Sequence, residues 1–207
     1  MHRRRLAAAS LLLILTAASG CNPEPDRSAS MTARTQTVRP TPSGSVAPPN
    51  GVDLLFAKMM VAHHAQAVSM SRTLLAKQGI PERAGNVAAY IEHDQQREID
   101  EMNQWLRAWG QPPVDPADPL IAQLHGSGAG HGMLTDAQLA EISQAAPKAA
   151  TELYLRHMIE HHLGAITMAR SALETGRNTY IRGLATHVIN EQSAENDAMR
   201  RLLDDLG

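Results

Sequence analysis

The chain has 207 residues, a formal net charge of −2, and 43% hydrophobic, 19% charged and 3% aromatic residues. This length allows one domain or two small ones. Two Trp, three Tyr and one Phe are too few for base-stacking platforms, and the near-neutral charge argues against a phosphate-binding surface, so we expect no nucleic-acid partner. Ten His, ten Met and a single Cys favour a soft or borderline metal over disulfide or thiol chemistry.

Residues 1–21 have the pattern of an export signal. Three arginines at positions 3–5 precede an apolar run over residues 6–18, which is too short to cross a bilayer, and small residues follow. The segment from Ala18 to Cys21 resembles a bacterial lipobox, with Ala18 in place of the usual Leu. That resemblance implies lipidation of Cys21 and anchoring to the outer face of the cell membrane, whereas ordinary cleavage would leave Cys21 as a thiol.

Residues 22–50 have the composition of a disordered tether. They include six prolines, many Ser and Thr residues and little apolar content. Such a segment stays flexible and extended, so about 30 residues would hold the following domain away from a membrane.

Residues 51–207 contain an internal repeat. Residues 53–78 match residues 151–176 at an offset of 98, and the segments that follow match at an offset of 97. Each copy reads as helix, short turn and helix, and no segment alternates with the period of a strand. One such hairpin cannot bury its apolar face alone, whereas two together form a four-helix bundle. We therefore predict an all-α domain with repeat one at 53–110 and repeat two at 148–207.

The first repeat carries local signals for its helix ends. Asp53 is expected to cap the first helix, Gly79 to end it, and Pro81 to lie in the first turn of the second. Gly110 is expected to close the second helix.

The connector, residues 111–147, is rich in Pro and Gly. Thr135 and Gln138 within it form a capping-box pattern that predicts a short helix to about Ala146. Pro147 then separates this helix from the second repeat.

Paired histidines lie on the apolar stripe of the first helix in each repeat. Helical spacing places His63 and His161 in the middle of these stripes, and His64 and His162 at their edges. A buried imidazole without a partner costs about 1–3 kcal/mol, so His63 and His161 each need a hydrogen bond or a metal. The second helices offer a Gln and a Glu, three residues apart, on an otherwise apolar face: Gln95, Glu98, Gln192 and Glu195.

Two interpretations of these polar residues remain open. In a structural network, Glu98 accepts from His63 and Glu195 from His161, while the two glutamines fill the remaining sites. In a metal site, His and Met are ligands, and the Glu and Gln residues orient the imidazoles. Buried Met residues often only fill the core, but a thioether beside an imidazole suits Cu(I), and Cu(II) less well.

The glycine-rich connector segment 125–133 contains His125, His131 and Met133. It is either a further metal-binding loop or a simple glycine linker. His93, His157 and His187 have no matching histidine in the other repeat, so we expect them at the surface or at helix boundaries.

Three sequence patterns are similar to those of one known family. They are Met60-x-x-His63-His64-x-x-Ala67-x-x-Met70 with its copy from Met158 to Met168, the segment Gly132-Met133-Leu134-Thr135, and the Gln-x-x-Glu-x-x-x-Met segments. These resemble the family catalogued as domain of unknown function 305, over roughly residues 51–207. The resemblance implies a ferritin-like fold and, by analogy with CopM-type members, extracytoplasmic copper binding. It makes eight residues the leading ligand candidates: Met60, His63, His64, Met70, Met158, His161, His162 and Met168.

The sequence thus predicts an exported, non-catalytic protein that sequesters or transfers copper, as Cu(I) or Cu(II). A homo-oligomer is left open. One alternative is a cell-envelope bundle that binds a partner or has a structural role without metal. The other is a di-iron oxidase, which needs Glu-x-x-His on two helices; the sequence contains no such motif.

Overall fold

The computed structural model describes residues 47–116 and 130–207. In these ranges the regular structure is helical: α1 (Gly51–Leu75), α2 (Glu82–Ala108), the 3-10 turn η1 (Gly130–Gly132), α4 (Asp136–Gln144), α5 (Pro147–Thr175) and α6 (Thr179–Leu206). The described residues form no strand, which confirms the all-α prediction. The predicted export signal, the predicted lipidation site Cys21, most of the predicted tether and His125 lie outside the described residues.

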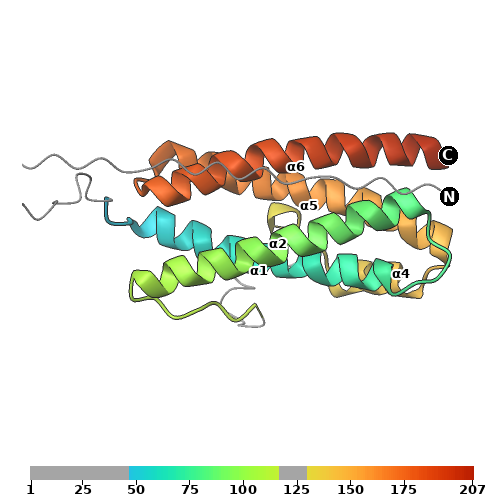
Figure 1. Cartoon of the computed structure of the whole chain (residues 1–207), viewed down its shortest axis with the longest axis horizontal. Coiled ribbons are helices and arrows are strands. Elements are labelled where there is room, and N and C mark those ends of the chain that lie inside the picture. Colours follow the sequence, from blue (N-terminus) through green and yellow to red (C-terminus); the bar gives the residue numbers. More distant parts are fainter. Residues whose placement is uncertain (1–46, 117–129) are drawn as a thin grey trace, which may run out of the picture. The chain divides into compact units, whose positions relative to one another are not determined.

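Two helical hairpins build the domain. Helix α1 packs along α2, and α5 packs along α6 (Figure 1). The hairpins meet mainly through α1 and α5, while η1 and α4 pack against α5. This arrangement confirms the predicted bundle of two repeated hairpins with a short connecting helix. None of the described helices is long and apolar enough to span a membrane.

Helices α1 and α5 run antiparallel through the core. The ring of His63 contacts that of His161, and Ser71, two turns further along α1, hydrogen-bonds to Tyr154, two turns back along α5. The two histidine-bearing helices therefore cross at matching positions of the two repeats.

The cap of α1 differs from the prediction. Asn50 is the N-cap, and Asp53 is the third helical residue, whose carboxylate accepts from the Asn50 backbone N–H in a capping box. Asp53 is fully buried, and its carboxylate also accepts hydrogen bonds from the backbone N–H groups of Arg177 and Asn178, just before α6. The same carboxylate thus closes one helix and holds the turn between two others.

The remaining helix ends follow ordinary stereochemistry. The Thr135–Gln138 capping box is present. Helix α4 ends at Gln144, earlier than predicted, because Ala146 precedes Pro147 and takes the extended backbone that a following proline favours. Pro147 begins α5 instead of merely interrupting the chain, since its missing N–H costs nothing in a first turn. Gly110, with φ of 70°, closes α2 as predicted.

Candidate metal centre

Four histidines form a layer in the middle of the bundle. His63 and His64 come from α1, His161 and His162 from α5, and all four are fully buried. The sequence placed His64 and His162 at the edges of their stripes, but both lie as deep as their neighbours. This depth arises because α2 and α6 cover the side of α1 and α5 on which the edge histidines lie.

His63 and His161 face each other. Their ring centroids are 3.7 Å apart, with the planes tilted by 36°. Two imidazolium ions at this distance in a buried site would repel strongly, so at most one ring is protonated. His63 Nε2 lies 2.9 Å from the carbonyl oxygen of His131. A carbonyl oxygen only accepts, so His63 Nε2 carries a proton.

The two glutamates pair with the edge histidines, so the predicted pairing with His63 and His161 is wrong. His64 Nε2 lies 2.7 Å from Glu98 Oε2, and His162 Nε2 lies 2.8 Å from Glu195 Oε2. The side chains of adjacent helix residues point about 100° apart. The second histidine of each pair, His64 or His162, therefore faces the second helix of its own hairpin. His63 and His161 instead face the other hairpin.

The two edge histidines differ in their hydrogen bonds: His64 leaves only Nδ1 without a partner in the described part of the chain, whereas His162 leaves both ring nitrogens without one. A carboxylate oxygen only accepts, so the proton of His64 lies on Nε2, in its hydrogen bond to Glu98, and the neutral ring has its lone pair on Nδ1. His162 Nε2 contacts Glu195 at 2.8 Å without forming a hydrogen bond. A carboxylate on one ring nitrogen and an available lone pair on the other is the arrangement of a metal-binding histidine.

The Glu98 carboxylate is held in its ionised form. Burial by itself would raise its pKa, but the hydrogen bond from His64 and the electrostatic influence of His64, His187 and Arg97 outweigh burial and lower the pKa. An ionised acceptor fixes the orientation and the tautomer of His64.

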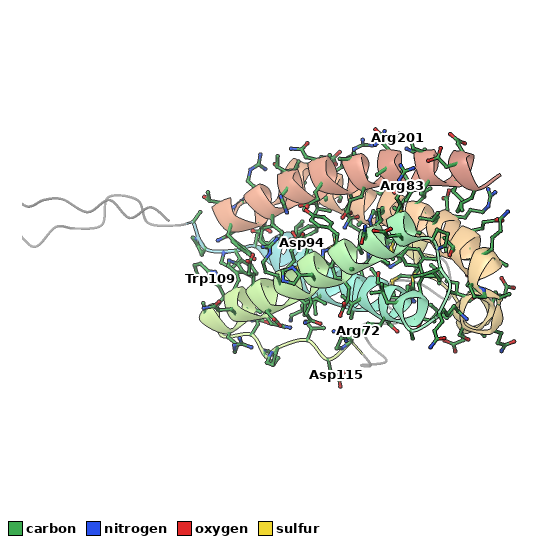
Figure 2. All side chains as sticks on the ribbon, turned by 45° about the vertical axis from the view of Figure 1, so that its right-hand side comes forward. Arg72, Arg83, Asp94, Trp109, Asp115 and Arg201 are labelled. Carbon is green, nitrogen blue, oxygen red and sulfur yellow. The ribbon has the colours of Figure 1, made fainter. Side chains whose placement is uncertain are left out.

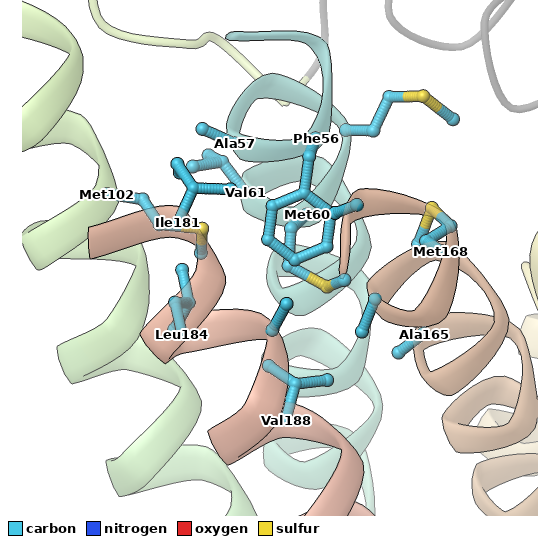
Figure 3. Packing of buried hydrophobic residues seen from close by; sticks show 14 of the residues in the cluster. Phe56, Ala57, Met60, Val61, Met102, Ala165, Met168, Ile181, Leu184 and Val188 are labelled. Atoms are coloured by element: carbon cyan, nitrogen blue, oxygen red, sulfur yellow. The ribbon is translucent and has the colours of Figure 1, made fainter. Parts of the chain in front are cut away.

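Six buried methionines fall into two matched groups. Met60, Met102 and Met168 belong to one packed core cluster, and Figure 3 shows them on α1, α2 and α5. Met158, Met199 and Met70, at the equivalent positions, belong to a second cluster. Met60 precedes His64 by one helical turn, and Met158 precedes His162 in the same way, so thioether and imidazole share a helix face. Each group therefore contains one methionine on the same helix face as an edge histidine.

These groups differ from the sets that the sequence suggested. Met60 and Met70 lie in different clusters, as do Met158 and Met168. The reason is that α1 and α5 are antiparallel, so Met60 packs in the same cluster as Met168, and Met70 in the same cluster as Met158. The structure also adds Met102 and Met199, the methionines of the two Gln-x-x-Glu-x-x-x-Met segments, which were not among the predicted ligands. Their spacing, four residues after Glu98 and Glu195, was the available signal.

Gln95 and Gln192 do not fill the remaining sites on the histidines. Both are buried and line a small pocket between α2 and α6. In the described residues, Gln95 Oε1 and Nε2 and Gln192 Oε1 have no hydrogen-bond partner.

The connector packs tightly instead of acting as a loose glycine linker over the residues that are described. A Cβ atom on Gly164 would lie 1.6 Å from the carbonyl oxygen of His131, so only glycine lets η1 rest on α5. The exposed His131 side chain lines a pocket of about 440 Å3 together with Met59 and Met168, while Met133 is half-buried. Two predicted metal residues from different parts of the chain, His131 and Met168, thus meet at a pocket near the surface.

The chain also matches a known protein family. Residues 53–203 match the model of the domain of unknown function DUF305. The chain belongs to the DUF305 family. No curated protein sequence matches it.

Solved structures agree with this membership. A DUF305 fragment from Deinococcus radiodurans is 28% identical, with a TM-score of 0.67, over 77% of this chain and 99% of that one. A DUF305 protein from Streptomyces coelicolor, described as a candidate secreted protein, is 31% identical, with a TM-score of 0.66, over 75% and 94% of the two chains. CopM in its Cu(II)-bound form is 30% identical, with a TM-score of 0.61, over 75% and 97%. CopM has also been solved with Cu(I) and with Ag bound.

Proposed function

We propose that this DUF305 protein binds copper, chiefly as Cu(I), in an extracytoplasmic compartment and acts without catalysis in its sequestration or transfer. The observation that carries the proposal is the pair of buried Nδ1 atoms without a hydrogen-bond partner on His64 and His162, whose Nε2 atoms lie 2.7 Å from Glu98 and 2.8 Å from Glu195. Relatedness to copper-binding CopM supports the choice of metal.

The donor chemistry favours Cu(I). A neutral imidazole nitrogen and thioether sulfurs form a soft, uncharged set that suits Cu(I) and is poor for Mg²⁺ or Ca²⁺. His64 would bind with Met60 and Met102, and His162 with Met158 and Met199. Glu98 and Glu195 would orient the rings, and each ionised carboxylate would offset the charge of a cation bound on the far side of its imidazole.

The pocket lined by Met59, Met168 and His131 offers a route from solvent. Its donors have the same soft character as those of the core, and Met168 belongs to the cluster that holds Met60. We propose that copper arrives at this pocket before it enters the core. Cys21, if lipidated, would hold the protein at the outer face of the cell membrane.

Competition against a chromogenic Cu(I) chelator tests this function. Purified protein should withdraw Cu(I) at sub-micromolar free metal, and His64→Ala and His162→Ala should each weaken the affinity by at least about tenfold. Met60→Leu preserves core volume, so it tests the thioether in a folded protein. His93→Ala, on the exposed face of α2, is the control and should leave the affinity unchanged. Failure of the wild-type protein to compete, or equal effects of all four substitutions, would favour the structural bundle instead.

A further inference from the structure

A second group of metal-ligand side chains lies outside the histidine layer, where α2 and α6 adjoin. Asp94 of α2 and His187 and Glu191 of α6 each offer one ligand atom, and these atoms lie within 4.8 Å of one another. Figure 2 shows Asp94 on the α2 ribbon. In the described part of the chain, this is the one group of three or more His, Asp or Glu side chains so placed. The His187 side chain is 46% exposed, so solvent reaches the group directly.

The group lies where equivalent positions of the two repeats meet. At the offset of 97 residues, Asp94 corresponds to Glu191, Gln95 to Gln192 and Glu98 to Glu195, and all six line one small pocket with His187. Four carboxylates therefore face a shared space. His64 and His162 contact Glu98 and Glu195 from the inner side and Arg97 pairs with Asp94 on α2, which leaves Glu191 to be balanced from the outer side.

His187 supplies part of that balance. Its Nε2 lies 3.2 Å from Glu98 Oε1 and also contacts Glu191 Oε2. Tyr90, the residue of α2 that corresponds to His187, donates its hydroxyl proton to Glu191 Oε1. Neighbouring carboxylates repel one another, so a cation bound among them would relieve more repulsion than a single imidazole can.

An independent observation points to a ligand in this pocket. Gln95 is 97% buried against the same side chains, yet neither amide atom has a hydrogen-bond partner in the described ranges. Leaving such buried atoms unsatisfied is unfavourable, because they lose their hydrogen bonds to water without gaining others. The pocket has a volume of about 10 Å3, close to what one water molecule needs. A hydrated cation at its mouth would place a water within reach of Gln95.

We propose that Asp94, His187 and Glu191 bind one divalent transition-metal ion, with Zn²⁺ as the matching probe. Two carboxylate oxygens and one imidazole nitrogen suit a borderline cation, and a water molecule completes a four-coordinate Zn²⁺. The set contains no sulfur, so it disfavours Cu(I), and its imidazole favours Zn²⁺ over Mg²⁺ or Ca²⁺. This site is chemically distinct from the thioether–imidazole groups in the core and does not depend on them.

Titration of the purified metal-free protein with Zn²⁺ against a chromophoric chelator tests the site. We expect one Zn²⁺ per chain from this site, and Asp94→Asn and His187→Ala should each weaken it by at least about tenfold. His93→Ala removes an exposed histidine one position away on α2 and should change the affinity less than twofold. Asp94 and His187 are partly exposed and each variant loses only partly exposed ion pairs, so both variants should stay folded without metal, with a melting temperature close to that of the wild-type protein.

Two further readouts separate this site from the core. Co²⁺ substituted for Zn²⁺ should give visible absorption bands that disappear in His187→Ala, and Cu(I) competition should be unchanged in Asp94→Asn. Absence of Zn²⁺ binding by the wild-type protein, or equal weakening by His93→Ala and His187→Ala, would overturn the proposal.

Discussion

The α1–α2 and α5–α6 hairpins repeat the same chemistry inside the bundle and differ where the connector and solvent reach them. Inside, a histidine contacts a glutamate in both hairpins, and each of the two core clusters contains one set of three matched methionines. Outside, Tyr90 of one copy corresponds to His187 of the other. The features that both hairpins share indicate where a duplicated function resides. The features that differ between the hairpins indicate what one copy acquired alone.

The connector also contacts the two hairpins in different ways. At position 66, α1 has a Gln whose amide donates to the Leu134 carbonyl and accepts from the Leu134 N–H. At the corresponding position, α5 has Gly164, against which the His131 backbone lies. One copy holds the connector by hydrogen bonds and the other by close approach, so the connector joins both halves of the histidine layer.

The largest effect on stability should come from Gly164→Ala. The added Cβ would overlap the His131 carbonyl, so η1 must move away and the contact of that carbonyl with His63 Nε2 is lost. We expect a loss of about 3 kcal/mol in the free energy of unfolding, measured by urea denaturation. Gly183→Ala is the matched control on α6, where a Cβ meets nothing within 4 Å, and it should stabilise by about 0.5–1 kcal/mol. Equal stability of the two variants would mean that η1 does not rest on α5.

A smaller effect is expected from Glu98→Gln and Glu195→Gln. Each removes a charged acceptor from an imidazole, which costs about 2 kcal/mol for Glu98 and about 1 kcal/mol for the more exposed Glu195. The pKa of Glu98 is lowered from its usual 4.5 in the folded protein, so its stabilisation is present above pH 4.5 and is lost as the pH falls through the folded pKa.

Urea denaturation of the metal-free protein at neutral and at acidic pH measures this difference. The gap between wild-type protein and Glu98→Gln should therefore shrink as the solution is acidified below pH 4.5. A gap that stays constant with pH would show that the ionised carboxylate does not stabilise the fold, and a larger loss for Glu195→Gln would reverse the expected order of the two hairpins.

The repeat predicted the fold, because two hairpins with matching apolar stripes have few ways to bury them. The site was predictable in composition but not in pairing. Which of His63 and His64 meets Glu98 depends on how far each helix is rotated about its axis, and this rotation is set by packing between hairpins. The grouping of Met60 with Met168 depends on antiparallel α1 and α5, which no spacing within one repeat reveals. His187 was expected only at the surface, because its partners, Asp94 and Glu98, lie about 90 positions earlier in the chain.

Anomalous diffraction at the copper edge from crystals of the Cu(I)-loaded protein tests the central claim most directly. Two peaks are predicted, one bonded to Nδ1 of His64 and one to Nδ1 of His162, each with methionine sulfur from its own group of three. Copper bound only at exposed histidines, with both Nδ1 atoms left without a metal, would contradict the assignment of the buried histidine layer as the copper site.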